Sequence, residues 1–395
     1  MRERYILMHQ NDEVLSFSVS FDDGLRCEII EKRSGFDKST FCVDKEISME
    51  KLNSLLSSFL TSRAIPMTRW DYEEILKNTG AKNVYELSFK GHGLSLSNHY
   101  WYQKEGESLK YEDINFFTNK WDDSFARCVL KGDYESLKNV SLDVPDIVTP
   151  GWGVKGWLCE EDGSHLYKIG IVKDHCEEPI AEVLASRFAK RLFNKNEVVD
   201  YQLKEIYGKY ASASKVIIGI DEELVPLSDI LSWRTHELYR ARNNDHDVTK
   251  AFFRELDQCD VPGLKEFFVK ISCFRSLCFV NDLHFDNLSV IRNINTGEMR
   301  LAPLLDLGSS FGSSERARNM LSKANKATYM IVYFIYSDLD PDWDYSWYKP
   351  ELLDGFENEI KEYLSKSDFY TDELINNIVD VYHHQKDALN TIAGK

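Results

Sequence analysis

The order of apolar and polar residues predicts a β-rich start followed by short helices. Residues 13–21 partly alternate between apolar and polar side chains, and an Asp-Asp-Gly turn leads into a second apolar run at 26–30. Two such runs around a tight turn indicate a β-hairpin. Apolar residues at helical spacing predict a helix over 48–62 and another over 70–78.

The pattern changes near residue 150. Residues 151–158 combine three glycines with tryptophans and apolar residues, which predicts a strand, a turn and a second strand. Residues 165–170 are predicted as a strand and 179–192 as a helix with one apolar face. The β-branched run 215–220 predicts a further strand.

The rest of the chain is predicted to be helical except for one hairpin. The helices are expected over 226–239, 247–257, 262–279, 314–326, 350–366 and 371–391. The hairpin follows from apolar runs on both sides of an Asn-Thr-Gly turn, within 288–304. This order predicts an α+β, bilobal, protein-kinase-like fold. We expect an N-terminal α+β subdomain (1–145), a β-rich ATP-binding lobe (146–225) and a larger helical catalytic lobe (226–395).

Composition supports a globular chain and argues against two classes of partner. The 395 residues are 43% hydrophobic, and the formal net charge is −17. Such a charge disfavours nucleic acids and anionic membranes, so neither is expected as a partner. The sequence has no long apolar run, no secretion signal and no Cys-x-x-Cys pair among its eight cysteines. We therefore expect a cytoplasmic protein with free thiols.

Three oxygen-bearing side chains stand in an order that suits phosphoryl transfer. Asp282 precedes Asn287 by five positions, and Asp306 opens an Asp-x-Gly sequence after the predicted hairpin. Kinase-type sites place a catalytic carboxylate and two magnesium ligands in this way. The sequence therefore predicts Asp282 as the catalytic carboxylate, with Asn287 and Asp306 as Mg²⁺ ligands.

Other readings of this loop remain open. The spacing from Asp to Asn is weak by itself, and Asp282 also suits a turn-capping role. His284 is a candidate for donating a hydrogen bond to a phosphate, or for organising the loop. Asp286 is either a further ligand or a solvated side chain.

ATP-binding residues are expected in the preceding lobe. Lys168, at the end of an apolar strand, is the candidate for the α- and β-phosphates. Glu182 on the next helix is a carboxylate that could pair with it, with Glu177 and Glu178 as rivals. The glycine-bearing turn could bring backbone N–H groups to the phosphates, and its residues are Gly151, Gly153, Lys155 and Gly156. Tight packing beside Trp152 and Trp157 is the alternative for these glycines.

Three segments resemble the HipA-like serine/threonine kinases, the toxin kinases of HipA–HipB modules. Residues 281–290 show Asp-x-His-x-x-Asn and an apolar strand, residues 301–306 show Leu-Ala-Pro-Leu-x-Asp, and residues 164–168 contain His-x-x-Lys. The resemblance implies a kinase fold with ATP and Mg²⁺ as cofactors. It assigns the same roles to Asp282, Asn287, Asp306 and Lys168. The family commonly has Lys where this chain has Asp286.

The resemblance also sets expectations for function and partners. It implies a serine/threonine protein kinase, the toxin of a toxin–antitoxin module, with a protein substrate and a helix-turn-helix antitoxin. Asp-x-His-x-Asp-Asn is similar to the catalytic loop of lipid kinases too, so a lipid or small-molecule kinase is one alternative. A nucleotide-binding pseudokinase that acts as a regulatory module is another.

Overall fold

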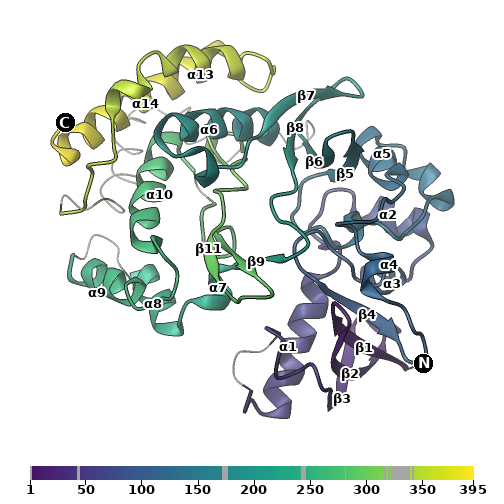
Figure 1. Cartoon of the computed structure of the whole chain (residues 1–395). Helices are drawn as coiled ribbons and strands as arrows, with labels where there is room; N and C mark the ends of the chain where they lie inside the picture. Colours follow the sequence, from purple (N-terminus) through teal and green to yellow (C-terminus); the bar gives the residue numbers. More distant parts are fainter. Residues whose placement is uncertain are drawn as a thin grey trace. The chain divides into compact units, whose positions relative to one another are not determined.

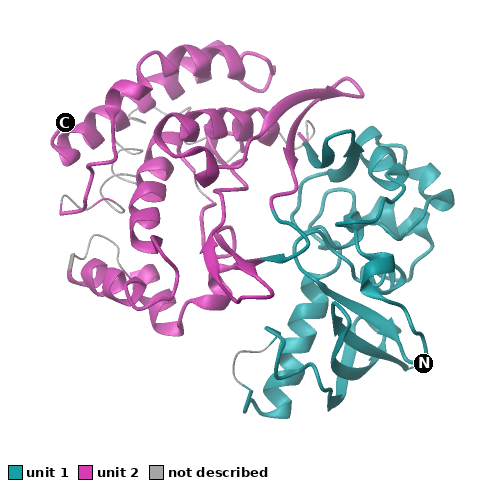
Figure 2. Cartoon of the chain, viewed as in Figure 1, with its two compact units in different colours: residues 1–168, 218–223 teal, residues 169–217, 224–395 magenta. Residues whose placement is uncertain are grey.

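The computed structural model describes residues 2–41, 45–170, 177–241, 246–280, 282–314, 317–318, 321, 339 and 342–395. The chain forms two compact units (Figures 1 and 2). Unit 1 comprises residues 1–168 and 218–223, and unit 2 comprises 169–217 and 224–395. The lobe expected over 146–225 is divided between the two units: its first two strands group mainly with unit 1, and the helix that follows them groups with unit 2. The three-part division expected from the sequence stays a prediction.

Unit 1 begins with a four-stranded antiparallel sheet in the order β3-β2-β1-β4. The strands are β1 (Glu3–His9), β2 (Asp12–Ser20), β3 (Arg26–Lys32) and β4 (Tyr100–Lys104). Helix α1 (Met49–Ser62) shares a buried apolar cluster with the sheet, and the Ser48 side chain caps its first turn. The predicted hairpin and first helix are confirmed.

The rest of unit 1 consists of short elements. The helices are α2 (Tyr72–Thr79), α3 (Val84–Lys90), α4 (Tyr111–Ile114) and α5 (Ser124–Lys131), and the 3₁₀ turns are η1 (Tyr134–Asn139) and η2 (Pro145–Val148). Strands β5 (Lys155–Glu160) and β6 (Gly163–Ile169) then form an antiparallel hairpin. The strand–turn–strand predicted over 151–158 is wrong, because only one strand begins there, at Lys155.

Unit 2 opens with helix α6 (Glu178–Leu192), the turn η4 (Lys195–Glu197) and a hairpin of β7 (Gln202–Ile206) and β8 (Lys209–Lys215). The strand predicted over 215–220 is wrong. The register with β7 ends at the pair Gln202–Ala213, and β8 itself ends at Lys215. The hairpin itself depends on a two-residue turn, in which Tyr207 and Gly208 both have positive φ.

The following part of unit 2 is largely helical. Its elements are β9 (Glu222–Pro226, of which Leu224–Pro226 belong here), α7 (Leu227–Ile230), α8 (Trp233–Ala241), α9 (His246–Leu256), α10 (Leu264–Cys278), β10 (Ser289–Asn293), β11 (Met299–Leu301), η5 (Pro350–Leu353), α13 (Phe356–Leu364) and α14 (Asp372–Ala393). The predicted β10–β11 hairpin is confirmed. The single helix expected over 226–239 is divided into α7 and α8. The helix expected over 314–326 lies mostly outside the described residues.

One apolar core joins the helices of unit 2. Phe188 of α6, Phe274 of α10 and Tyr382 of α14 are fully buried members of it. Figure 1 shows α13 and α14 beside α6. Among the described residues, no helix combines the length and apolar character needed to cross a membrane. The six cysteines that the structure describes with their side chains are free thiols, of which Cys273 and Cys278 are buried.

Candidate functional site

The candidate catalytic loop begins at the end of the buried helix α10. Phe279 adopts a left-handed conformation with a φ of 57°, and the backbone N–H groups of Phe279 and Val280 both donate to the Arg275 oxygen. A left-handed residue at this place ends a helix and satisfies its last carbonyls. Because α10 is buried along most of its length, the start of the loop is fixed by the core.

Within the loop, apolar and polar side chains alternate. Leu283 and Phe285 are buried, whereas Asp282, His284 and Asp286 are exposed. Side chains that alternate along an extended segment point to opposite sides. The apolar pair therefore anchors the loop, and the polar residues face solvent.

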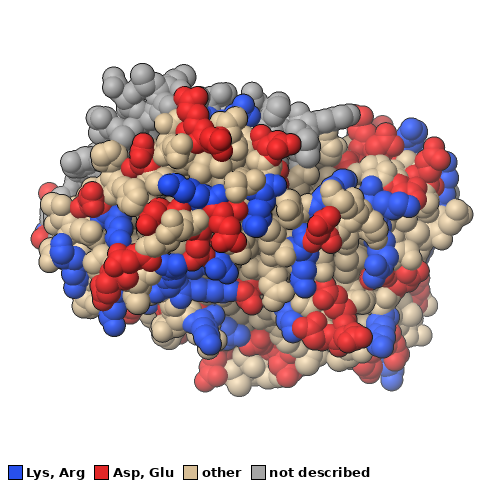
Figure 3. Space-filling model, turned by 90° about the horizontal axis from the view of Figure 1, so that it is seen from above, with Lys and Arg blue, Asp and Glu red and all other residues tan. Residues whose placement is uncertain are grey.

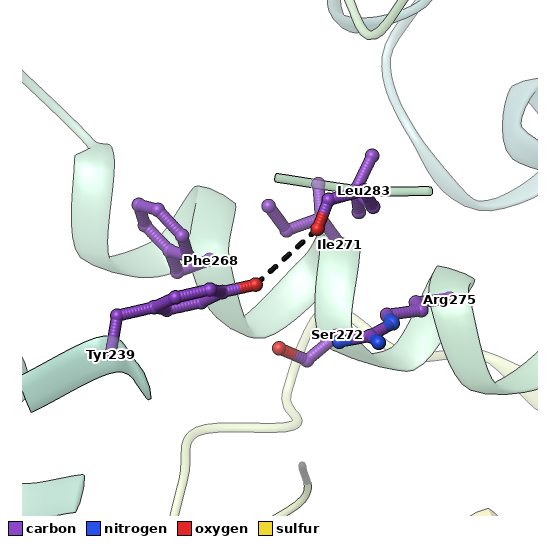
Figure 4. Close-up of a pocket in the computed structure, with 6 residues that line it drawn as sticks. All are labelled: Tyr239, Phe268, Ile271, Ser272, Arg275 and Leu283. Atoms are coloured by element: carbon purple, nitrogen blue, oxygen red, sulfur yellow. Dashed lines mark hydrogen bonds between the residues drawn. The ribbon is translucent and has the colours of Figure 1, made fainter. Parts of the chain in front are cut away.

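The anchor lies over α10 (Figure 4). The Tyr239 hydroxyl donates to the Leu283 backbone oxygen over 3.4 Å. A cavity of about 10 Å³ lies here, lined by Tyr239, Phe268, Ile271, Ser272, Arg275 and Leu283. Space of this size holds one water molecule at most. The cavity therefore belongs to the support of the loop and has no room for a substrate.

Asn287 closes the loop onto Asp282. The Asn287 side-chain N–H donates to the Asp282 backbone oxygen over 2.7 Å, and the Asn287 backbone N–H donates to the His284 oxygen over 3.0 Å. Only the amide nitrogen can donate to a carbonyl, so the contact fixes which way the amide is turned. The amide oxygen is then the atom that could bind a hard cation such as Mg²⁺.

His284 lies between two carboxylates. Its Nε2 is 3.3 Å from Asp282 Oδ1, and its Nδ1 is 3.3 Å from Asp286 Oδ2. The Asp286 backbone N–H also approaches Nδ1 at 3.3 Å. In the tautomer with hydrogen on Nε2, the ring accepts this bond and donates to Asp282. These contacts favour the loop-organising role among the two expected for His284.

Asp306 is held in an unusual backbone conformation. Its φ is 57°, and its backbone N–H donates to the Tyr201 hydroxyl over 3.0 Å. Just before it, Leu304 pairs with Val198 in a parallel bridge, and the Leu304 N–H donates to the Glu197 oxygen. Asp tolerates the left-handed region better than most residues. This half-buried side chain therefore follows a fixed segment, as a metal ligand should.

Asn287 and Asp306 emerge at the same end of the β10–β11 hairpin. The Ala302 N–H donates to the Ser289 oxygen over 2.9 Å, which marks the open end of the hairpin. Asn287 precedes Ser289 by two positions, and Asp306 follows Ala302 by four. Asn287 and Asp306 therefore lie two and four residues from the last hydrogen bond at the open end of the hairpin.

The sequence did not point to Asp229, which lies beside this loop on α7. The pKa of the Asp229 carboxyl is raised. The larger cause is desolvation by the surrounding protein, and the second is the negative charge of Asp286. The Ser228 N–H donates to the Phe285 oxygen over 3.3 Å, which holds α7 against the loop. A third acid therefore accompanies Asp282 and Asp286. A four-residue helix carries no motif that would reveal it.

The three carboxylates at the start of α6 differ in their surroundings. Glu182 is fully buried and accepts a hydrogen bond from the Ser212 hydroxyl of β8. Burial raises the pKa of Glu177, which accepts from the Ser367 hydroxyl over 2.8 Å. Glu178 packs against Gly308, where an added Cβ would lie 3.0 Å from Glu178 Cβ. Glu178 therefore lies beside the Asp-x-Gly segment that begins at Asp306.

The expected ATP-binding residues of unit 1 lie on and before the β5–β6 hairpin. Lys168, near the end of β6, pairs in register with Lys155 of β5 and is half-buried. Lys155 is mostly buried, and its ammonium group donates to the Pro150 oxygen over 2.8 Å. In this conformation the Lys155 charge is turned towards its own loop.

The three glycines of this loop have different surroundings. Gly151 is exposed with a φ of 98°, and Gly153 is buried. At Gly156 an added Cβ would lie 2.7 Å from the Ala126 Cβ of α5. Packing against α5 therefore accounts for glycine at 156, whereas Gly151 keeps the exposure that a phosphate contact needs.

A separate group of metal-ligating side chains lies at the turn between β5 and β6. His165 Nδ1 is 3.8 Å from Glu160, and its Nε2 is 3.8 Å from Asp162. The Tyr167 hydroxyl also donates to Glu160. The two acids therefore approach opposite nitrogens of the same ring.

Charge is mixed on the surface shown in Figure 3. Acidic and basic side chains are interspersed on this face. Ion pairs of Arg187 and Arg191 with Glu359 join α6 to α13. The negative net charge of the chain is therefore not gathered into one patch on this face.

Compared by sequence, the chain matches no protein-family model and no curated protein. Compared by structure, it is similar to HipA of Shewanella oneidensis MR-1, solved with HipB and its operator DNA. The TM-score is 0.50 at 12% identity, over 99% of this chain and 97% of that chain. It is also similar to the proinflammatory kinase CtkA of Helicobacter pylori, with a TM-score of 0.44 at 15% identity, over 62% of this chain and 92% of that chain. The likeness to HipA confirms the fold expected from the sequence.

Proposed function

We propose that this chain, which has the fold of the HipA-like kinases, transfers the γ-phosphate of Mg·ATP to a serine or threonine hydroxyl of a protein. The observation that carries the proposal is the closed loop of unit 2. Asn287 is tied to the Asp282 backbone over 2.7 Å, and Asp306 emerges at the same end of the β10–β11 hairpin. An amide oxygen and one carboxylate are the protein ligands of a kinase magnesium site, and a second carboxylate serves as the catalytic base.

Each residue of the loop takes a role that its contacts allow. Asp282 is exposed and accepts the proton of the acceptor hydroxyl, which orients that oxygen for in-line attack. His284, between Asp282 and Asp286, holds the carboxylate in position. Asn287 Oδ1 and Asp306 are the atoms that would hold Mg²⁺, which neutralises phosphate charge when bound.

Unit 1 supplies the candidates for the nucleotide phosphates. Lys168 is assigned to the α- and β-phosphates. Glu182, on α6 of unit 2, is kept as a candidate carboxylate for ATP binding. Gly151, Gly153 and Gly156 are assigned to the loop over the phosphates, with Lys155 as a second cation. Lys155 would have to release the Pro150 oxygen to act there.

We extend the proposal to a toxin with a protein antitoxin. The support is the resemblance of three sequence segments to toxin kinases and the fold shared with a HipA solved together with HipB and operator DNA. The antitoxin, rather than this chain, would contact DNA. The expected absence of direct nucleic-acid binding stays a prediction, as does a cytoplasmic location.

One experiment tests the activity and the substrate class together. Phosphopeptides are compared between cells that express the wild-type chain and cells that express Asp282→Asn at the same level. The proposal expects a small set of serine or threonine peptides that depends on Asp282, and growth arrest with the wild type alone. If a labelled lipid or small molecule formed without phosphopeptides, the chain would be a lipid or small-molecule kinase instead of a protein kinase. If no product formed, the chain would be a nucleotide-binding pseudokinase.

A further inference from the structure

Strand β9 connects the two units and is anchored in unit 1 by a buried ion pair. Its second residue, Glu223, belongs to unit 1 and is 2% exposed. His9 Nε2, at the end of β1, lies 2.6 Å from Glu223 Oε1. The Thr40 hydroxyl donates to the other carboxylate oxygen over 3.4 Å. A hydrogen bond this short to a carboxylate ranks among the stronger ones.

A second histidine holds the backbone of the same segment. His99 is fully buried, and burial lowers its pKa, so its neutral form is favoured. Its Nε2 donates to the Glu222 backbone oxygen over 2.9 Å, and its Nδ1 accepts from the Tyr111 hydroxyl over 2.6 Å. Two neighbouring residues of β9 are therefore fixed by side chains from β1 and from the start of β4.

Four residues later the same chain segment meets the catalytic loop. In unit 2, the Leu227 N–H donates to the Leu288 oxygen over 2.8 Å, and the Ser228 N–H donates to the Phe285 oxygen over 3.3 Å. These two carbonyls flank Asp286 and Asn287. The intervening residues are in strand β9, whose extended backbone has little slack. Strand β9 therefore links the anchor at Glu223 to Leu227 through three residues of extended chain.

We infer that His9 is a positioning residue for the catalytic loop: its ion pair with Glu223 anchors β9, and β9 in turn holds the loop residues Phe285 to Leu288. The N-terminal subdomain, for which the sequence offered no role, then controls the geometry around Asp282 and Asn287. Loss of His9 removes the 2.6 Å contact of the Glu223 carboxylate, whereas the Thr40 hydroxyl and the positive charge of Arg63 remain near it. This inference rests on the proposed function only where turnover is measured.

The first test is amide hydrogen exchange in the full chain. We compare the wild type with His9→Leu, with Glu223→Gln and with the double variant. His9→Leu should speed exchange of the Leu227 and Ser228 amides roughly tenfold. Adding Glu223→Gln should reverse part of that change, because a neutral amide is less costly to bury than a carboxylate that has lost one partner. Arg4→Leu is the matched control, since Arg4 lies on the same strand and pairs with Glu105 at the exposed surface.

The exchange readout does not require kinase activity, so it separates this inference from the proposed function. Unchanged exchange at Leu227 and Ser228 in both single variants would overturn the inference, as would equal effects of Arg4→Leu and His9→Leu.

If the chain phosphorylates protein, His9→Leu should also lower kcat about tenfold at a temperature where the variant is folded, with partial rescue in the double variant. A purely structural role would lower the melting temperature and leave kcat unchanged, which would contradict the inference. If His9→Leu does not fold, the exchange of the Leu227 and Ser228 amides in Glu223→Gln alone tests the inference.

Discussion

Asn287 donates its side-chain amide hydrogen to the backbone oxygen of Asp282 over 2.7 Å. This bond sets the distance between the candidate catalytic carboxylate and a candidate metal ligand. The bond also requires a side-chain donor at position 287, so a residue with a side-chain oxygen alone cannot replace asparagine.

Asn287→Asp should therefore inactivate the site although it keeps a ligand oxygen. The carboxylate cannot donate to the Asp282 oxygen and is repelled by it, so the loop opens. We expect kcat to fall roughly 100-fold. Asp286→Asn is the control, because Asp286 is exposed in the same loop and makes no such contact with Asp282; it should retain most of the activity. Full activity of Asn287→Asp would refute the role of the hydrogen bond.

Asp306 allows its charge and its backbone conformation to be tested separately. Asn tolerates a φ of 57° about as well as Asp, whereas Ala does not. We expect Asp306→Asn to retain the melting temperature but to lose most Mg²⁺-dependent nucleotide binding, measured by calorimetry with and without the metal. Asp306→Ala should lose binding and some stability. Normal metal-dependent affinity in Asp306→Asn would show that this carboxylate is not a ligand.

The sequence predicted the parts of the site that depend on local pattern. The apolar length of α10, the Asp-to-Asn spacing and the turn of the β10–β11 hairpin all lie within one stretch of chain, and each was recognisable there. Secondary structure set by long-range pairing was predicted less well. The run 215–220 is apolar enough for a strand, but β8 ends at Lys215, and a local apolar pattern does not reveal where pairing stops.

Contacts distant in sequence account for what was missed at the site. Asp229 gains its raised pKa from neighbours that only the folded chain assembles. Glu223 is an ordinary acid in the sequence, and its buried pairing with His9 joins residues 214 positions apart. Neither residue type nor spacing carries that information.

Asp146 predicts a pH-dependent stability for unit 1. It is buried, its Oδ1 accepts from the Trp157 N–H, and its Oδ2 has no hydrogen-bond partner among the described residues. Burial raises its pKa to about 7. A folded-state pKa above the unfolded one means that this group stabilises the fold at low pH. The contribution is fully present below about pH 4 and is lost as the pH rises through about 7.

Asp146→Asn should therefore be more stable than the wild type at pH 8 and close to it at pH 4. The difference at pH 8 is at most about 4 kcal/mol, from a shift of about three units. Urea unfolding at the two pH values measures it. A wild type that gains stability over the variant as the pH rises would contradict the burial argument.

Gly156 should be intolerant of even a methyl group. An added Cβ would lie 2.7 Å from Ala126 Cβ, so Gly156→Ala should destabilise the chain by about 1–3 kcal/mol through overpacking. Gly219→Ala is the matched control, because nothing lies within 4 Å of its added Cβ. Thermal unfolding of both variants provides the comparison, and an unchanged melting temperature for Gly156→Ala would show that α5 does not constrain this position.

Phosphoryl transfer from labelled ATP is the most direct measurement of the central claim. Purified wild type and Asp282→Asn are each incubated with Mg·ATP and total cell protein, and nucleotide binding is measured in parallel. We predict protein labelling by the wild type, a loss of at least about 100-fold in Asp282→Asn, and similar ATP affinity for both. Equal labelling by the two proteins would contradict the assignment of Asp282, and with it the account of this site.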